Sequence, residues 1–273
     1  MQVLIDERFQ FTDYAVKPVY CDVDPPVFSG SDTKELFSKN LRTMPMNWHY
    51  RTKEVYYIRN KLGFRTKDIE DLDKGNYFLA YGCSFTEGVG LAEDETWPYK
   101  LGKLLSMDYL NLGVGGGSPD LVHLQSISYV SNVTGHKPKF VIIQWPSQAR
   151  QIVKNLKEFV PIVPNVPYAT KEASNQYHWS VKTNSFLYDS YMAYMSTQGL
   201  WKAFGVPVFN WAIDGEWNNI APLVKHIYPN DAEVQLENMA RDLMHFGNIY
   251  QDRVAKELKK QITRDPKFRS APG

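Results

Sequence analysis

From residue 77 onward, short apolar runs alternate with longer amphipathic stretches, and this alternation constrains the fold more than any other feature of the chain. The apolar runs are bounded by Gly, Asn, Pro or Ser, which is typical of buried parallel strands. They cover residues 77–81, 109–112, 140–145 and 206–213. The amphipathic stretches predict helices over residues 96–107, 118–133, 184–204 and 246–262. Such alternation predicts an α/β fold with a parallel central sheet, in which ligands bind beyond the carboxyl ends of the strands.

The first part of the chain, up to about residue 74, lacks this alternation and is punctuated by prolines. One short helix is expected to begin after Asp32, which would cap it, with Glu35 completing a capping box. The region also carries several large aromatic side chains, namely Trp48, Tyr50, Tyr56 and Tyr57. We therefore expect an N-terminal extension that packs against the core.

Charge and cysteine content argue against several classes of function. The 31 Lys and Arg residues are balanced by 30 Asp and Glu residues, and no dense basic stripe is present, so nucleic acid is not expected as a partner. Cys21 and Cys83 form no CxxC pair, and neither has a histidine at metal-ligand spacing. We expect no bound metal, no cofactor and no disulfide framework.

The N-terminal residues lack the basic and apolar regions of a signal peptide. The apolar runs, such as residues 140–143, are far shorter than the roughly 20 residues that span a bilayer. The expectation is a protein without a membrane span, located in the cytoplasm or on a particle such as a virion. No pattern in the sequence indicates its oligomeric state.

Ser84 follows the first predicted strand, in the segment GCSFTEG. A serine at the carboxyl end of a strand, beside a glycine that permits a tight turn, can present its hydroxyl as a nucleophile. A Ser/Thr turn that caps a helix is an equally good interpretation of the spacing. The segment differs from the GxSxG elbow of the α/β-hydrolases, because Thr86 stands at the second glycine position.

A glycine cluster at residues 113–117 follows the second predicted strand. Ser118 is a natural N-cap for the next helix, with Pro119 at its first position. Free backbone N–H groups in such a cluster can bind an anion or a developing oxyanion, although a plain strand-to-helix turn fits as well. The segment matches neither GxGxxG nor a phosphate loop.

Two further polar landmarks follow. The third strand ends in WPSQAR, residues 145–150, which carries hydrogen-bond donors. Late in the chain, Asp242 and His245 stand three apart, so the carboxylate can orient the imidazole for proton abstraction. A pair on a helix surface is the alternative interpretation of this spacing.

Taken together and in this order, the four landmarks resemble those of the SGNH (GDSL-like) hydrolases, a flavodoxin-like three-layer α/β/α family of esterases and related acyl hydrolases. GCSFT resembles the family's GDSxT block and implies that Ser84 is the nucleophile. NLGVGGGS resembles the second block, which implies that the N–H groups of Gly116 and Ser84 bind the oxyanion. The terminal block implies that His245 is the general base and Asp242 its orienting carboxylate.

The resemblance also includes IRNKLGFR, residues 58–65, and Trp97, so it covers roughly residues 54–262. We divide the chain into an extension, residues 1–53, and a hydrolase-like domain, residues 54–273. Cys83 replaces the aspartate of the first block. The asparagine that the third block supplies to the oxyanion hole is missing from WPSQAR. Either Ser147 or Gln148 donates in its place, or the hole has two donors rather than three.

The expected function is that of a serine ester hydrolase that removes small acyl groups, such as acetyl, from a carbohydrate or another small ester. An O-acyltransferase that uses the same serine, and a catalytically weak or inactive binding or structural module of a larger assembly, remain alternatives. Trp145, Arg150 and an aromatic insert between residues 150 and 191 are expected to shape the substrate pocket. The aromatic residues meant are Tyr168, Tyr177 and Trp179. Asp214 is the alternative partner of His245.

Overall fold

The computed structural model describes residues 27–73, 75–132, 136–154, 159–162, 171–213, 215–219, 221 and 223–266. Its centre is a five-stranded sheet in the order β2-β1-β3-β6-β7, with every neighbouring pair parallel. The strands are β1 (Tyr77–Tyr81), β2 (Asp108–Asn111), β3 (Phe140–Gln144), β6 (Val208–Ala212) and β7 (Lys225–His226). The strand order reverses between β1 and β3, and the crevice at such a switch point is where doubly wound sheets bind ligands.

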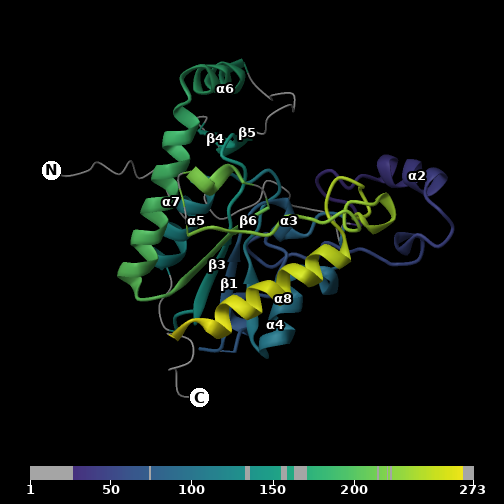
Figure 1. The fold of residues 1–273 in the computed structure, drawn as a ribbon, viewed down its shortest axis with the longest axis horizontal. Helices are drawn as coiled ribbons and strands as arrows, with labels where there is room; N and C mark the ends of the chain where they lie inside the picture. Colours follow the sequence, from purple (N-terminus) through teal and green to yellow (C-terminus); the bar gives the residue numbers. More distant parts are fainter. Residues whose placement is uncertain are drawn as a thin grey trace.

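Two pairs of helices cover the sheet, one pair on each face (Figure 1). One face carries α4 (Trp97–Leu105) and α8 (Asn248–Arg264), and the other carries α5 (Pro119–Asn132) and α7 (Ser185–Phe204). The predicted three-layer α/β/α arrangement with a parallel central sheet is therefore confirmed. Within the described ranges, no helix has the length and apolar character needed to cross a membrane.

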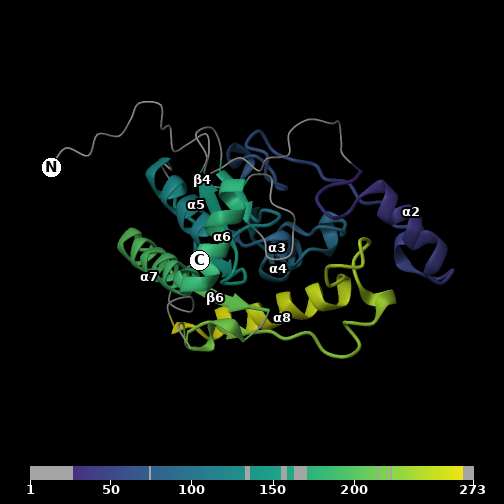
Figure 2. The same ribbon diagram turned by 90° about the horizontal axis from the view of Figure 1, so that it is seen from above.

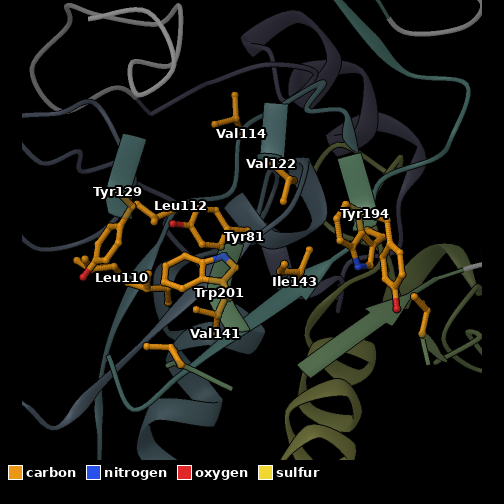
Figure 3. Packing of buried hydrophobic residues seen from close by; sticks show 14 of the residues in the cluster. Tyr81, Leu110, Leu112, Val114, Val122, Tyr129, Val141, Ile143, Tyr194 and Trp201 are labelled. Carbon is orange, nitrogen blue, oxygen red and sulfur yellow. The ribbon is translucent and has the colours of Figure 1, made fainter. Parts of the chain in front are cut away.

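Successive side chains of each strand point to opposite faces, so the sheet builds two separate apolar layers. In the layer under α5 and α7, Trp201 of α7 lies against Tyr81 of β1, with ring centroids 6.2 Å apart (Figure 3). In the layer under α4 and α8, Trp97 meets Trp211 of β6 edge to face at 5.8 Å. Apolar cover on both faces explains why the strands are continuous apolar runs.

The predicted strands and helices agree with the observed ones to within a few residues, and Ser118 caps α5 as expected, accepting a hydrogen bond from the Leu121 N–H at 3.4 Å. The insert was not predicted in detail. It contains an antiparallel hairpin, β4 (Gln151–Lys154) and β5 (Phe159–Ile162), and then α6 (Lys171–Thr183). Tyr168 lies outside the described residues.

Within the described residues, the remaining helical segments are short. They are α2 (Lys34–Thr43), α3 (Ser84–Glu87) and five 3₁₀ turns, at His49–Arg51, Ile69–Asp71, Glu93–Glu95, Glu216–Asn219 and Leu236–Asn238. The views in Figure 1 and Figure 2 place α2 at the end of the molecule where the chain approaches α8. The described part of the N-terminal extension therefore lies beside a segment some two hundred residues later in the chain.

The cap of α2 corrects the expectation for Asp32. Thr33 is the N-cap, and its hydroxyl accepts from the Leu36 N–H at 3.1 Å. Asp32 is fully buried and accepts from the Arg241 guanidinium, with Nη2 at 2.6 Å and Nε at 3.0 Å from its oxygens. A buried guanidinium needs a counter-ion far more than a helix end needs a cap, so the carboxylate pairs with the arginine.

Residues 27–53, the described part of the expected extension, share an apolar cluster with the chain beyond residue 53. Its buried members come from both sides of the expected boundary at residues 53 and 54, and they are Met44, Trp48, Tyr50, Val55, Tyr57, Leu91 and Ala240. Tyr57 also donates its hydroxyl to Asp32 at 2.6 Å. The cluster and the ion pair together fasten residues 27–53 to the chain around Arg241.

Replacing Asp32 by alanine is expected to lower the free energy of unfolding by about 3–5 kcal/mol, because Arg241 would stay buried without its counter-ion. Urea unfolding followed by tryptophan fluorescence measures this loss. Asp252→Ala removes half of an exposed pair with Lys256 on α8 and should cost less than about 1 kcal/mol. Equal costs for the two variants would show that the buried pair does not anchor the extension.

Candidate active site

Ser84 is the first residue of α3, directly after β1 and at the switch point of the sheet. The turn that carries it leaves no room for a side chain at Gly82, where an added Cβ would lie 2.2 Å from Thr86 Oγ1 and 2.8 Å from Gln144 Oε1. Gly88 ends the short helix in the left-handed conformation, with φ of 82°. The glycines therefore permit the tight turn that fixes Ser84 at the carboxyl end of the strands.

Ser84, His245 and Asp242 form a continuous chain of hydrogen bonds. The Oγ of Ser84 lies 2.7 Å from Nε2 of His245, and Nδ1 of His245 lies 2.7 Å from Oδ2 of Asp242. Because a carboxylate only accepts hydrogen bonds, Nδ1 carries the proton, and Nε2 is left to accept from the serine hydroxyl. The structure thus brings together the three residues expected to form the catalytic group, across 161 positions of sequence.

The Asp242 carboxylate is held by its own turn. Its Oδ1 accepts from the backbone N–H of Met244 at 3.0 Å and of His245 at 3.2 Å, and Leu243, the residue directly after Asp242, has a positive φ of 56°. Burial by itself would raise the pKa of Asp242, but the hydrogen bond and charge of His245, with hydrogen bonds from Ser31 and Met244, lower it below its ordinary value. Asp242 is therefore ionised when it orients His245.

The imidazole of His245 is largely enclosed, with only 8% of the residue exposed. The ring of Phe85, the residue after Ser84, meets it edge-on at a centroid distance of 4.7 Å. The carbonyl of His245 accepts from the Ala240 N–H at 2.8 Å, which closes the turn that carries Asp242. With its ring against Phe85 and its backbone fixed in this turn, His245 holds the orientation in which Nε2 meets the Ser84 hydroxyl.

The glycine cluster lies directly against the turn that carries Ser84. A Cβ at Gly113 would lie 2.4 Å from the Glu87 nitrogen, and one at Gly117 would lie 3.2 Å from the Gly82 carbonyl oxygen. The loop is further held by Glu87, whose Oε2 accepts from the Gly115 N–H at 2.7 Å. Close backbone contact, rather than flexibility alone, explains why glycines occupy these positions.

Among the described residues, two backbone N–H groups at this junction donate to no protein acceptor, those of Ser84 and Gly116. Ser84 begins its helix, so its N–H has no intrahelical acceptor, and Gly116 sits in the left-handed region with φ of 74°. Across the described ranges, no acceptor takes a hydrogen bond from either N–H. These are the two groups that the resemblance implies for the oxyanion hole.

Ser147 and Gln148, the two candidates for a third oxyanion donor, differ in their hydrogen bonds and burial. The side-chain nitrogen of Gln148 donates to the Glu216 carbonyl at 3.0 Å, and its backbone N–H donates to the Glu216 carboxylate at 2.9 Å. Ser147 is half-buried, and its hydroxyl oxygen accepts from the Ala149 N–H at 3.4 Å, which leaves the hydroxyl hydrogen available. Ser147 is therefore the more accessible of the two candidates, because Gln148 is buried against Glu216.

The two expected pocket residues behave differently. Trp145 is 2% exposed and belongs to the core, where its indole N–H donates to Asn210 at 2.9 Å and its ring packs on Tyr194. It therefore offers almost no surface to a substrate, because the large apolar ring is more stable within the layer under α7. Arg150 is half-buried, and its Nη1 has no hydrogen-bond partner within the described part of the chain.

Gln144 is a site residue that the sequence did not indicate. Its Oε1 accepts from Thr86 Oγ1 at 2.9 Å and lies 3.4 Å from both the backbone nitrogen and the thiol of Cys83. It links the end of β3 to the turn that carries Ser84, and it contacts Cys83, the residue that replaces the aspartate of the family's first block. A polar residue at the end of an otherwise apolar buried strand is the only signal the sequence held.

The alternative carboxylate, Asp214, lies outside the described residues. Within the described ranges, no group of three or more His, Cys, Asp or Glu side chains is arranged to hold a metal ion. The arrangement of a hydroxyl, an imidazole and an ionised carboxylate can generate a nucleophile without one.

No model of a known protein family matches this chain, and no curated protein matches it in sequence. Solved structures that match include a carbohydrate esterase with 13% identity and a TM-score of 0.44, over 71% of this chain and 66% of that one. A lipolytic GDSL-family protein from Veillonella parvula matches with 12% identity and a TM-score of 0.42, over 69% of this chain and 99% of that one.

A putative lipolytic GDSL-family protein from Desulfitobacterium hafniense matches with 14% identity and a TM-score of 0.35, over 68% of this chain and 98% of that one. These proteins are distant from this chain, so the chemistry of the site is inferred from its own residues and contacts. In its parallel α/β/α fold, and in the order of Ser84, Gly116, Asp242 and His245 along the chain, the protein is similar to the SGNH hydrolases.

Proposed function

We propose that the protein is a serine ester hydrolase whose catalytic group is Ser84, His245 and Asp242. The observation that carries this proposal is the unbroken chain of hydrogen bonds from the Ser84 hydroxyl through both ring nitrogens of His245 to Asp242. The group lies at the switch point of the sheet, where a substrate has access to the carboxyl ends of the strands. A hydroxyl activated in this way attacks acyl carbonyls.

The first half of the reaction forms an acyl-enzyme. As the Oγ of Ser84 attacks the ester carbonyl, Nε2 of His245 takes the hydroxyl proton, and the carbonyl electron pair moves onto the oxygen. The N–H groups of Ser84 and Gly116, joined by the Ser147 hydroxyl, bind this oxyanion. Collapse of the intermediate breaks the bond to the alcohol, which leaves with the proton that His245 returns.

The second half repeats these steps with water. The water oxygen attacks the acyl carbon while His245 removes a proton from the water, which forms a second tetrahedral intermediate. When this intermediate collapses, His245 returns the proton to the Oγ of Ser84, and the carboxylic acid is released. Asp242 stays ionised throughout and stabilises the imidazolium that forms in each half. Small acyl esters, such as acetyl groups on a carbohydrate, are the proposed substrates.

Labelling with a fluorophosphonate tests the proposed nucleophile, because the reagent forms a stable adduct only with an activated serine. We expect one adduct, located on Ser84 by peptide mass spectrometry, and release of acetate from aryl acetates and O-acetylated sugars. Ser84→Ala should abolish both, whereas Ser38→Ala, which removes an exposed hydroxyl on α2, should change neither. No adduct at Ser84 and no turnover above Ser84→Ala would refute the proposed function.

A further inference from the structure

The Asp242 carboxylate receives a hydrogen bond from far away in the chain. The Oγ of Ser31, in the N-terminal extension, donates to Oδ2 of Asp242 at 2.6 Å, although the two residues are 211 positions apart. This is the same oxygen that accepts from Nδ1 of His245 at 2.7 Å. The hydroxyl therefore contacts the catalytic group itself, at the atom that orients the base.

Counting the donors shows what Ser31 adds. An ionised carboxylate has about four lone-pair sites. At Asp242, two are filled by the backbone N–H groups of Met244 and His245, one by the imidazole and one by Ser31. With every site filled, the carboxylate cannot rotate without breaking hydrogen bonds to a charged group, which are worth about 1.5–3 kcal/mol each.

The position of Ser31 is determined by its neighbour. The turn at residues 29–32 is closed by two backbone hydrogen bonds between Ser29 and Asp32, each 3.1 Å long. Asp32 in turn pairs with Arg241, the residue directly before Asp242. The buried ion pair thus brings the two turns together and fixes Ser31 opposite the catalytic carboxylate.

The other side of Asp242 is closed as well. Tyr57 donates to Asp32 and accepts from the Gly90 N–H at 2.8 Å, and Gly90 accepts from the Arg241 N–H at 2.9 Å. A Cβ at Gly90 would lie 3.1 Å from Oδ1 of Asp242. The carboxylate is therefore packed between its own turn, the Gly90 loop and the N-terminal extension, and among the described residues only Ser31 of the extension supplies it with a side-chain hydroxyl.

We propose that Ser31 is a positioning residue for the Asp242–His245 pair, so that the N-terminal extension completes the active site. The inference rests on the proposed function for its effect on activity. The hydroxyl holds Asp242 in the one orientation in which Oδ2 faces Nδ1, and through it keeps Nε2 aimed at Ser84. A residue that acts in this way alters the rate of the chemical steps more than the binding of the substrate.

Three variants of the full chain test this role. In Ser31→Ala, kcat per fluorophosphonate-titrated site should fall about tenfold while KM stays within about twofold of the parent value. Ser31→Thr keeps a hydroxyl at the same position and should restore most of the rate. Ser38→Ala serves as the matched control, because it removes a hydroxyl from the same extension without touching the catalytic group.

A spectroscopic measurement separates this role from general destabilisation and from the proposed function. The downfield proton NMR signal of the His245 Nδ1–H, identified by its absence in His245→Ala, should move or broaden in Ser31→Ala and return in Ser31→Thr. An unmoved signal with kcat within about twofold of the parent would overturn the proposal, as would an equal loss in Ser38→Ala. A moved signal in a protein without esterase activity would uphold the role of Ser31 and refute only the proposed reaction.

Discussion

Replacing His245 by alanine is expected to lower kcat/KM for an acetyl ester by about 10⁴–10⁶-fold, because nothing else in the site can take the Ser84 proton. The imidazole is the only group within the described ranges that lies in hydrogen-bond contact with the serine hydroxyl. Fluorophosphonate labelling of Ser84 should slow to a similar extent. Ester hydrolysis is measured with purified protein at saturating and subsaturating ester, and the labelling rate is measured with the fluorophosphonate alone.

His136→Ala is the matched control for this prediction. His136 is exposed and precedes β3, so it lies at the amino ends of the strands, opposite the catalytic group. The double variant Ser84→Ala, His245→Ala should lose no more activity than either single variant, because residues that act as one unit are strongly non-additive. Additive losses, or a His245→Ala protein with near-parental turnover, would contradict the proposed mechanism.

Asp242→Asn is expected to fold normally and to lose about 10⁴-fold in kcat. Each oxygen of this carboxylate accepts two hydrogen bonds, so the NH₂ group of an asparagine must replace one oxygen and face the two donors that it served. The backbone N–H groups at Oδ1 cannot turn away, which leaves the NH₂ group facing Nδ1 of His245. The imidazole would then carry its proton on Nε2 and could no longer accept one from Ser84.

Steady-state kinetics at saturating ester measure this loss, and thermal unfolding checks that the variant is folded. Asp252→Asn, on the exposed face of α8, makes the same change of a carboxylate to an amide away from the site and should leave kcat unchanged. If Asp242→Asn keeps full activity, another carboxylate orients His245, and Asp214 is the first to be replaced next.

Local sequence signals predicted most of the sheet and its helices. The residues of β1, and those of β3 before Gln144, are apolar because both faces of the sheet are covered, and that burial is visible as a continuous run. Ser118 and Pro119 marked the start of α5 in the same local way. Such features depend on neighbours along the chain, which is why one sequence suffices to find them.

The errors have the opposite origin. Asp32 has the spacing of a helix cap, yet it pairs with Arg241, which lies 209 positions away. Trp145 follows a strand at the edge where substrates bind, yet its ring is buried against Tyr194 of α7. In both cases a contact with a residue distant in the sequence outweighed the local preference, and the neighbouring residues do not indicate which residue that is.

Local patterns along the chain were enough to predict the parallel α/β architecture and the turns that carry Ser84, the glycine cluster and the Asp242–His245 pair, because strand burial and turn chemistry are local. The folded structure was needed to show that Nε2 of His245 meets the Ser84 hydroxyl and that Ser31 fills the last site on Asp242. These contacts span 161 and 211 positions and form when the sheet and the buried Asp32–Arg241 pair bring distant turns together. Residue spacing cannot predict these contacts, because they result from the packing of the whole chain.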